Sequence, residues 1–552
     1  MSKLRHYKNL ILELLNLVKN LKFQMICAIF FGSTGHIFAT LIPGLGGYYL
    51  AKLILGKNVD FKLAAIIIFS LGIIRSIFKY IEQLFNHYVA FKTLATIRDK
   101  VFKKLRELSP AKMEEKNKGE LISIITADIE LLEVFYAHTI SPVCIALIHS
   151  LVFFVVLFKF HYIYSLILLL FHLILAVVVP IITEKSARNI GRVQRGDLSR
   201  LNSKILETFK GLKEIINFNY NDERLEEINS LTRELNKSTK RLSIKSGDNF
   251  SLSSAIIIFS NIVFLIVAAH LYRNNQVDIL GVIFPFCVFI SSFGPTSALS
   301  SLANNLVLTF ACGERVMELF KEEPVVKENL SDESVSYKNL QLKNVDFSYD
   351  DTELIDNFNY NIENNEVIGL SGKSGCGKST IIKLIMRFFD TKGGAISINN
   401  KNIKDLNSIN LRNNISYASQ ETHLFKGSIR ENLLIAKQNA SEEELIKACK
   451  KANIYDFISE QKNGFDTEIV KEDNLLSTGQ MQRLALARMF LRDSKLYLLD
   501  EPTANIDALN EGIILKSLFN EKKDKTIIIS SHRKSSHRIC DKIIKMERGI
   551  KS

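Results

Sequence analysis

The first part of the chain alternates long apolar segments with polar, basic ones. Each apolar segment covers the roughly 20 residues that a helix needs to cross a bilayer. Six such segments occur, at residues 23–50, 62–84, 139–159, 162–183, 253–273 and 279–310. They form pairs, which short connections join at 51–61, 160–161 and 274–278. The pattern therefore predicts an α-helical membrane domain with six transmembrane helices.

Two long polar stretches, 91–137 and 184–252, separate the pairs. They hold 9 and 14 Lys and Arg residues, whereas the short connections hold very few. Because basic loops stay on the cytoplasmic side of a membrane, these stretches and both chain termini are expected in the cytoplasm. Their helical periodicity and the low proline count of 8 predict long, unbroken helices that continue beyond the bilayer. Residues 4–20 have one apolar helical face, which predicts a helix on the membrane surface.

The pattern changes after the sixth span. Residues 321–336 are polar and charged and include a proline, as expected of a linker. Beyond them, short β-rich runs such as "EVIGL" and "KLYLLD" alternate with helical patterns, which is typical of an α/β domain with a largely parallel sheet. We therefore expect a transmembrane domain over 1–320, a linker over 321–336 and an α/β domain over 337–552.

Composition agrees with a membrane part joined to a soluble part. Of the 552 residues, 47% are hydrophobic and 23% are charged, and the mean hydropathy is +0.10. The net charge of +13 lies mostly beside the apolar segments, and without a nucleic-acid-binding motif no nucleic-acid partner is expected. The seven cysteines are far apart and lack CxxC or Cys/His spacing, which argues against a disulfide scaffold and a zinc site. No cleavable signal peptide is apparent.

A glycine-rich loop carries the first chemical signal. The string "GLSGKSGCGKST" follows a predicted strand and precedes the helical "IIKLIMRFF". This is the spacing and context of a P-loop, in which backbone N–H groups surround phosphate oxygens, a lysine reaches the β- and γ-phosphates and a hydroxyl binds Mg²⁺. The predicted nucleotide-binding residues of the loop are Gly372, Ser374, Gly375, Cys376, Gly377, Lys378, Ser379 and Thr380.

Two further motifs fit an ATPase. "KLYLLDEP" is an apolar strand that ends in two carboxylates, of which Asp500 would hold Mg²⁺ and Glu501 could polarise the attacking water. "LLSTGQMQR" places Ser477 and Gly479 at a predicted helix start, where free N–H groups and the helix dipole attract an anion.

The order of the P-loop, "LLSTGQMQR", "LLDEPTANID" and "SSHR" resembles that of the ABC ATPases. With six preceding spans, the chain resembles a half-transporter of the exporter-type (type IV) fold over essentially its whole length. "GELISIITADIELLEVFYAHTISP" and "KGLKEIINFNYNDERL" resemble the two cytoplasmic loops that press on the ATPases. The resemblance implies a membrane domain followed by an α/β P-loop ATPase domain, with ATP and Mg²⁺ as cofactors. "AHTISP" and "IPGLGGYYL" also resemble the branch of bacterial cytochrome bd-assembly exporters of cysteine and glutathione.

The resemblance also implies roles for individual residues. Tyr349 would stack on adenine, and Gln420 would contact Mg²⁺ and sense the transmembrane helices. Glu501 would be the catalytic base, His532 would hold the γ-phosphate and Asp507 would be the D-loop aspartate. The implied catalytic residues are Glu501, His532 and Gln420, and the implied metal ligands are Ser379, Gln420 and Asp500.

Ser477, Gly479 and Gln480 match the signature motif of this family. That motif binds the ATP held by the P-loop of the opposite subunit. The resemblance therefore implies a dimer with a second half-transporter, and it leaves open whether the dimer is homomeric or heteromeric.

Three departures from the family pattern stand out. Thr478 replaces a usual glycine, so that hydrolysis could be slower or asymmetric. Val470 and Lys471 replace a usual Gly-Glu pair, which affects communication with the transmembrane helices. The chain ends soon after His532, so the usual closing helices are expected to be short or missing. An active ATPase is still expected, because Glu501 and His532 are retained.

Charged and imidazole side chains inside the spans give clues to what the membrane domain could bind. Arg75, Lys79 and Glu82 share one face of the second span, and charges inside a span are costly. They fit either a cavity that favours an anionic substrate group or, as the more ordinary interpretation, an internal salt bridge or a cytoplasmic extension of the helix. Six histidines lie in or at the ends of spans, at 36, 138, 149, 161, 172 and 270. They fit interface positions better than haem or metal ligation, since no pair has i, i+4 spacing.

The chain as a whole predicts ATP-driven transport of an unidentified small solute or peptide by alternating access, in the direction of export. The expected location is the bacterial cytoplasmic membrane, with the ATPase domain in the cytoplasm. The expected partners are the bilayer, the substrate and a second half-transporter. Import of a siderophore- or haem-like compound is one alternative. A regulatory ABC ATPase that transports nothing is the other, although Glu501 and the six spans speak against it.

Overall fold

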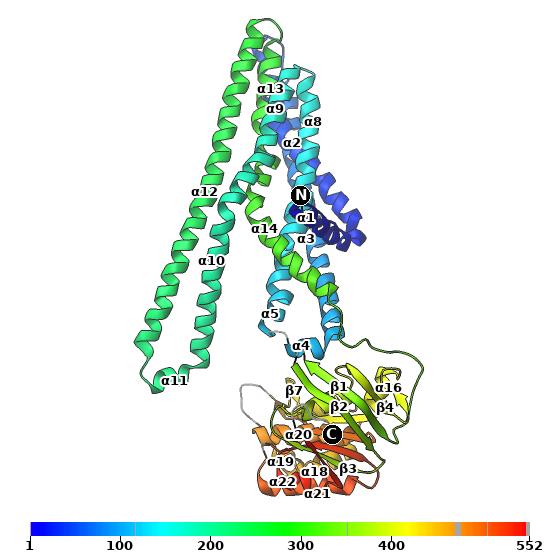
Figure 1. Cartoon of the computed structure of the whole chain (residues 1–552). Helices are drawn as coiled ribbons and strands as arrows, with labels where there is room; N and C mark the ends of the chain where they lie inside the picture. The colour runs from blue at the N-terminus through cyan, green and yellow to red at the C-terminus, as the bar shows by residue number, and fades with distance from the viewer. Residues whose placement is uncertain (1, 116–117, 350–351, 470–475, 505, 548–552) are drawn as a thin grey trace. The chain divides into compact units, whose positions relative to one another are not determined.

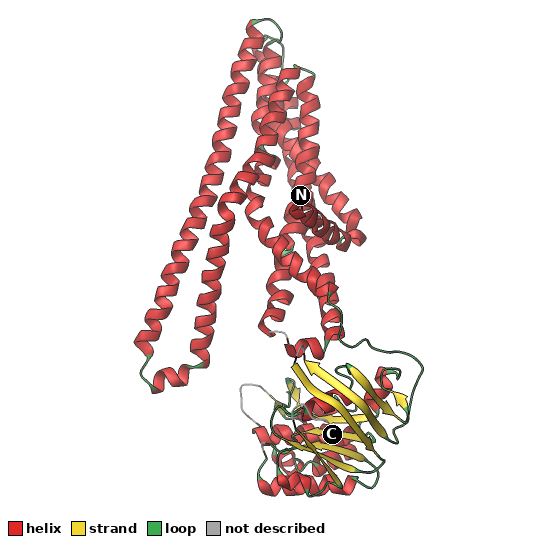
Figure 2. Ribbon diagram, viewed as in Figure 1, coloured by secondary structure: helices red, strands yellow, loops and turns green. Residues whose placement is uncertain are grey.

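The chain divides into two compact units, one helical and one that combines sheets with helices (Figure 1, Figure 2). The first comprises Met1–Lys104 and Lys116–Glu322, and the second comprises Leu105–Glu115 and Glu323–Ser552. The computed structural model describes residues 2–115, 118–349, 352–469, 476–504 and 506–547. The finer limits expected for the linker stay a prediction.

The six predicted transmembrane helices are confirmed within the described residues. They are the helical stretches Lys19–Ile54, Phe61–Leu108, Leu121–Phe158, Tyr162–Ile182, Asn221–Arg273 and Ile279–Ser300. Two of them are far longer than a bilayer requires: α3 (Phe61–Leu108) has 48 residues and α12 (Asn221–Arg273) has 53. The second polar stretch can remain helical because it contains no proline.

The sixth span differs from the expected unbroken helix. It is divided between α13 (Ile279–Ser291) and α14 (Gly294–Lys321), and Pro295 lies in the first turn of α14. Proline lacks the N–H that a continuous helix would pair with the fourth preceding carbonyl, so the chain restarts its helix here. The remaining helices of the unit are α1 (Ser2–Leu17), α2 (Lys22–Ile54), α5 (Lys118–Ser123), α6 (Ile129–Leu131), α7 (Glu133–Phe135), α8 (Ser141–Phe158), α9 (Tyr162–Leu173), α10 (Val179–Lys210) and α11 (Leu212–Asn217).

Two buried histidines hold the transmembrane helices together by hydrogen bonds. His149 Nε2 lies 2.9 Å from Thr40 Oγ1. His172 lies between two hydroxyls, with Nδ1 2.8 Å from Ser150 Oγ and Nε2 3.1 Å from Ser292 Oγ. Within the described residues no group of three or more His, Cys, Asp or Glu side chains is arranged to hold a metal ion. The hydrogen bonds of these two imidazoles connect α2, α8, α9 and the α13–α14 junction.

The amphipathic N-terminal helix packs against its own unit. Leu10 and Leu14 of α1 are buried, and the Tyr136 hydroxyl donates to the Leu14 carbonyl over 3.1 Å. The apolar face predicted from the sequence thus has a protein partner, while its place at a membrane surface stays a prediction.

The second unit is built on a five-stranded sheet with the order β11-β3-β10-β9-β6. All its adjacent pairs are parallel, as the sequence predicts. Every residue of β9 and β10 is buried, as expected of strands covered on both faces. The strands are β3 (Val367–Gly372), β6 (Ile415–Ala418), β9 (Leu496–Asp500), β10 (Thr526–Ser530) and β11 (Lys542–Met546).

The other sheets of this unit are antiparallel. One has the order β2-β1-β4-β5, and a two-stranded sheet pairs β7 with β8. Their strands are β1 (Leu340–Tyr349), β2 (Thr352–Ile362), β4 (Gly393–Ile398), β5 (Lys401–Asn402), β7 (Gly427–Ser428) and β8 (Glu468–Ile469). The helices of the unit are α4 (Ala111–Glu115), α15 (Lys378–Ile385), α16 (Ser408–Asn413), α17 (Ile429–Leu434), α18 (Glu442–Lys451), α19 (Tyr455–Glu460), α20 (Thr478–Arg492), α21 (Ala508–Glu521) and α22 (Lys534–His537).

The register of the parallel sheet positions the functional residues. Ser530 pairs with Asp500 on one side and with Leu370 on the other. The carboxyl ends of β3, β9 and β10 therefore meet at one edge, which is where open α/β sheets bind ligands.

Candidate nucleotide site

The P-loop runs from β3 into α15. Gly377 precedes the helix with φ of +103°, a conformation that favours glycine. Gly372 has no room for a side chain, because a Cβ there would lie 2.3 Å from the carbonyl oxygen of Met546. The Lys378 ammonium is buried and donates to the carbonyl oxygens of Gly372 over 2.9 Å and Lys373 over 3.1 Å. The loop thus encloses its own lysine.

A hydroxyl and a carboxylate meet beside the P-loop. Ser379 Oγ donates to Asp500 Oδ1 over 2.8 Å, and Ser530 Oγ donates to the same oxygen over 2.9 Å. Ser379 is in the first turn of α15, while Asp500 ends β9 and Ser530 ends β10. Hydroxyl and carboxylate oxygens are ligands that Mg²⁺ prefers. These side chains therefore fit the metal ion that accompanies ATP.

The carboxylate of Glu501 lies between two of the predicted catalytic side chains. Gln420 Nε2 donates to Glu501 Oε2 over 3.3 Å, and His532 Nδ1 lies 3.3 Å from Glu501 Oε1. The backbone of Glu501 has φ of +48°, which costs a non-glycine residue about 1–2 kcal/mol. Two hydrogen bonds hold it there: Glu501 N donates to Ser530 O over 3.0 Å, and Gln482 Nε2 donates to Glu501 O over 2.9 Å.

The predicted anion site is a capped helix start. The backbone N–H of Gln480 donates to Ser477 Oγ over 3.2 Å, and the N–H of Ser477 donates to Gln480 Oε1 over 2.8 Å. Ser477 and Thr478 are exposed at the beginning of α20. Within the described part of the chain, no hydrogen bond connects Ser477 or Gln480 to the P-loop, so the structure does not bring these two predicted phosphate sites together.

Two other predicted residues have structural partners in the same unit. The half-buried Tyr349 ring makes edge contacts with Phe347 and Phe389, with centroids 4.9 and 5.3 Å away. Asp507 caps α21 by accepting from the N–H groups of Leu509 and Asn510 over 3.2 and 3.1 Å. The hydrogen bond from the Asn510 side chain lowers the pKa of Asp507. Both residues remain accessible, which their predicted roles require, and those roles stay predictions.

Two family models match the chain. The model described as "ABC transporter" covers residues 355–504, and the model described as "ABC transporter transmembrane region" covers 25–296. A probable ABC transporter ATP-binding/permease protein of Haemophilus influenzae is 38% identical over 97% of this chain and 98% of its own length. The chain belongs to the ABC transporter family. It is therefore a multi-pass membrane protein whose ATPase domain binds and hydrolyses ATP.

More distant relatives of this ABC transporter include exporters. A putative multidrug export ATP-binding/permease protein of Staphylococcus aureus is 28% identical over 97% of this chain and 94% of its own length. An ATP-dependent lipid A-core flippase of Haemophilus influenzae is 28% identical over 88% of this chain and 84% of its own length. The solved structure of a bacterial Atm1-family ABC exporter with ATP bound has a TM-score of 0.83 at 20% identity, over 96% of this chain and 94% of that chain. The likeness confirms an exporter-type fold.

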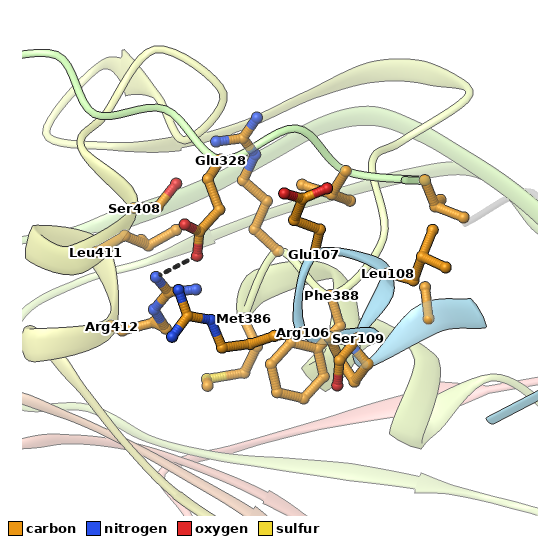
Figure 3. Close-up of a pocket in the computed structure, with 15 residues that line it drawn as sticks. Arg106, Glu107, Leu108, Ser109, Glu328, Met386, Phe388, Ser408, Leu411 and Arg412 are labelled. Atoms are coloured by element: carbon orange, nitrogen blue, oxygen red, sulfur yellow. Dashed lines mark hydrogen bonds and ion pairs between the residues drawn. The ribbon is translucent and has the colours of Figure 1, made fainter. Parts of the chain in front are cut away.

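The ATPase unit of the transporter also contains a segment from the first polar stretch. Leu105–Glu115 belongs to this unit, and Ala111 is part of its hydrophobic core. Figure 3 shows Arg106, Leu108 and their neighbours lining a cavity of about 70 Å³, in which Arg412 donates to Glu328 over 2.8 Å. This segment precedes the strings that resemble the family's cytoplasmic loops.

The sequence did not indicate an ion pair near Glu501, in which the Glu511 carboxylate is buried and the Arg533 side chain is 29% exposed. Arg533 Nη1 donates to Glu511 Oε2 over 2.9 Å, and Arg533 Nη2 donates to the Ala504 carbonyl over 2.8 Å. Glu511 also accepts from Thr503 over 3.1 Å and from Ser535 over 2.7 Å. The pair therefore ties the segment after Glu501 to the segment after His532. The signal in the sequence was the basic residue directly after the "SSH" string.

The motifs "LLSTGQMQR" and "SSHR" also contain Gln482 and Ser530, whose roles at the site the sequence did not indicate. Gln482 is a buried amide on the packed face of α20, and Ser530 is the last residue of a fully buried strand. A polar residue in such a position needs a partner, and these two find theirs at Glu501 and Asp500. Val470 and Lys471, which replace the usual Gly-Glu pair of the family, lie outside the described residues.

Proposed function

We propose that this ABC transporter is a dimeric exporter of a small solute or peptide in the bacterial cytoplasmic membrane, with its ATPase domains in the cytoplasm. One observation carries the dimer: the P-loop and the Ser477 helix start are both well formed but share no hydrogen bond within the described chain. Each would be completed by a second half-transporter, so that two ATP molecules lie between two chains. The basic composition of the long polar stretches supports the orientation.

The residues of the site suggest a separate role for each side chain in ATP hydrolysis. Lys378 and the P-loop N–H groups would hold the phosphates, and Ser379 and Asp500 would hold Mg²⁺, which neutralises phosphate charge when bound. Glu501 would orient the attacking water and accept its proton, a role worth about 10²–10⁴ in rate. His532 and Gln420 flank that carboxylate. Their positions favour contacts of these two side chains with the γ-phosphate and with the attacking water.

Closure of the dimer around ATP would drive transport by alternating access. The coupling would pass through helices that extend beyond the bilayer, as α3 and α12 do. Hydrolysis and release would then reset the cavity. The export-named relatives support the direction, and nothing in the fold favours import or a purely regulatory ATPase.

Inverted membrane vesicles provide the test. Vesicles would be incubated with ATP and the small-molecule fraction of a cell extract, and their contents measured by mass spectrometry. We expect ATP-dependent enrichment of at least one compound with the wild-type protein and none with Glu501→Gln. The exposed Glu443→Gln serves as the matched control and should behave as the wild type. Equal contents in wild-type and Glu501→Gln vesicles would contradict export.

A dilution series tests the dimer separately. ATP turnover per chain should fall when the purified protein is diluted in detergent, because each ATP site needs both chains. A constant turnover by a demonstrated monomer would contradict the dimeric site.

A further inference from the structure

A polar cavity lies among the transmembrane helices of the first unit. Its volume is about 260 Å³, which is just below the range of about 300–1,000 Å³ for ligand pockets. Residues of α2, α3, α8, α14 and the short π-helical segment Tyr136–Ile140 line it. The polar side chains among them are His36, Lys79, Glu82, Gln83, Asn86 and His138.

The accessible charge of this cavity is positive. Lys79 Nζ donates to Glu82 Oε2 over 2.8 Å, so the two residues form the internal salt bridge that the sequence allowed. The Lys79 side chain is 48% exposed, whereas that of Glu82 is 4% exposed. An ammonium group has three N–H donors, and the bond to Glu82 uses one of them. Lys79 can therefore offer its remaining donors to an anion while Glu82 stays covered.

The packing explains why Glu82 is covered. A Cβ on Gly32 of α2 would lie 3.0 Å from Glu82 Cδ and 2.4 Å from Ile145 Cδ1. The absence of a side chain at Gly32 lets the carboxylate fit against α2. The salt bridge thus presents its cation toward the cavity.

A buried amide in the wall has an unused hydrogen-bonding atom. Asn86 is 2% exposed and lines the cavity, and its Oδ1 has no hydrogen-bond partner among the described residues. A buried polar atom without a partner lowers the stability of the fold. A ligand that reaches this buried oxygen and donates a hydrogen bond to it would remove that cost.

We propose that this cavity receives an anionic group of the transported solute, with Lys79 binding the anion and Asn86 accepting a hydrogen bond from an adjacent donor group. The proposal rests on the proposed transport function and adds the chemistry of its cargo. The anion could belong to a water-soluble compound or to a lipid headgroup, because both present the same chemistry to Lys79.

Charged thiol reagents can measure the preference directly. Full-length Gln83→Cys would be treated in nanodiscs of phosphatidylcholine with an anionic sulfonatoethyl or a cationic trimethylammonioethyl methanethiosulfonate. Mass spectrometry of the peptide that contains position 83 separates this reaction from that of the native cysteines. We expect the anionic reagent to react at least about tenfold faster, because a charged cleft raises the local concentration of counter-ions.

Two further substitutions in the Gln83→Cys protein test whether Lys79 causes the preference for the anionic reagent. Lys79→Gln in the Gln83→Cys background should bring the two rates to within about twofold of each other. Glu82→Gln should maintain or increase the anionic preference, because it removes only the negative partner. Equal rates in Gln83→Cys itself, or an unchanged preference after Lys79→Gln, would overturn the proposal.

A transport readout separates this proposal from the proposed function. Anionic modification at position 83 should abolish ATP-dependent enrichment in inverted vesicles, whereas the same treatment of Tyr80→Cys, outside the cavity, should not. Enrichment that persists after modification at 83 would overturn the cavity as a solute site while export stands. No enrichment by the unmodified protein, with the reagent preference intact, would count against export alone.

The lipid composition distinguishes the two sources of the anion. Nanodiscs that contain phosphatidylglycerol should slow the anionic reagent several-fold if a lipid headgroup occupies the cavity. An unchanged rate would assign the cavity to water-soluble anions. The lipid comparison identifies only the source of the anion, because the reagent preference in phosphatidylcholine already decides whether the cavity favours anions.

Discussion

The Ser379 hydroxyl and the Asp500 carboxylate are joined by a hydrogen bond of 2.8 Å across 121 positions of sequence. This contact places a residue of the P-loop helix beside the end of the central strand. We expect Ser379→Ala to raise the Mg²⁺ concentration needed for half-maximal ATP turnover by about 10–100-fold, as loss of a metal-site partner does. A magnesium titration measures it, with the exposed Ser459→Ala as control. An unchanged requirement would remove Ser379 from the metal site.

Tyr349 provides a test of adenine recognition. Stacking of a base on an aromatic ring is worth about 1–3 kcal/mol, so Tyr349→Ala should raise the KM for ATP by about 5–150-fold. The kcat should fall much less, because the ring does not touch the reacting phosphate. Tyr349→Phe keeps the ring and should restore the wild-type KM. A variant with reduced kcat and normal KM would contradict stacking.

Thr478 tests whether the signature motif reduces the hydrolysis rate. Its side chain is exposed at the start of α20, so its removal leaves the packing intact. We expect Thr478→Gly to increase ATP turnover about threefold, which corresponds to about 0.7 kcal/mol of barrier. Thr478→Ser keeps the Cβ and should gain much less. Identical turnover in all three proteins would show that the substitution is neutral.

Glu511 gives the stability of the ATPase unit a pH dependence. Burial raises the pKa of this carboxyl, but hydrogen bonds from Ser535, Arg533 and Thr503 outweigh it, so that the pKa in the folded protein is lowered. A lowered pKa stabilises the fold above the pKa of the unfolded chain, and the stabilisation disappears as the pH falls through the folded pKa.

We therefore expect Glu511→Gln to destabilise the protein by about 1–3 kcal/mol at pH 7 and by progressively less as the pH falls below about 4.3. Urea unfolding followed by the fluorescence of a dye that binds exposed apolar surface measures this difference. The exposed Glu443→Gln should show no such dependence. A difference that stays constant with pH would show that the Glu511 charge is not involved.

The local geometry of the P-loop could be predicted from its sequence. The spacing of Gly372, Gly377 and Lys378 determines where the chain needs a close approach, a positive φ and a lysine. The meeting of Ser379 with Asp500 was also predictable, because Asp500 ends one strand of the parallel sheet and Ser379 lies in the helix after another. Such contacts follow from the order of strands and short turns.

Other contacts depend on packing that spacing does not determine. Gln482 lies within "QMQRLALARM", and nothing in that string indicates that its amide reaches the carbonyl of Glu501. Lys79 and Glu82 are three positions apart, which fits an internal salt bridge, the more ordinary interpretation, and also fits a cavity wall. The structure shows both at once, because Gly32 on another helix covers only the carboxylate. The exposure of Lys79 and the burial of Glu82 therefore depend on Gly32, which lies about 50 positions earlier in the chain.

The cap of α20 has a consequence for how the signature motif could meet a phosphate. A serine hydroxyl can accept and donate hydrogen bonds at the same time. Ser477 Oγ uses a lone pair to accept from the N–H of Gln480, and its own proton remains available to point elsewhere. An arriving phosphate oxygen could take that proton without unwinding the first turn of the helix. Ser477 Oγ would thus cap α20 and bind the nucleotide at the same time. The first turn of the helix would then keep its hydrogen bonds through each cycle.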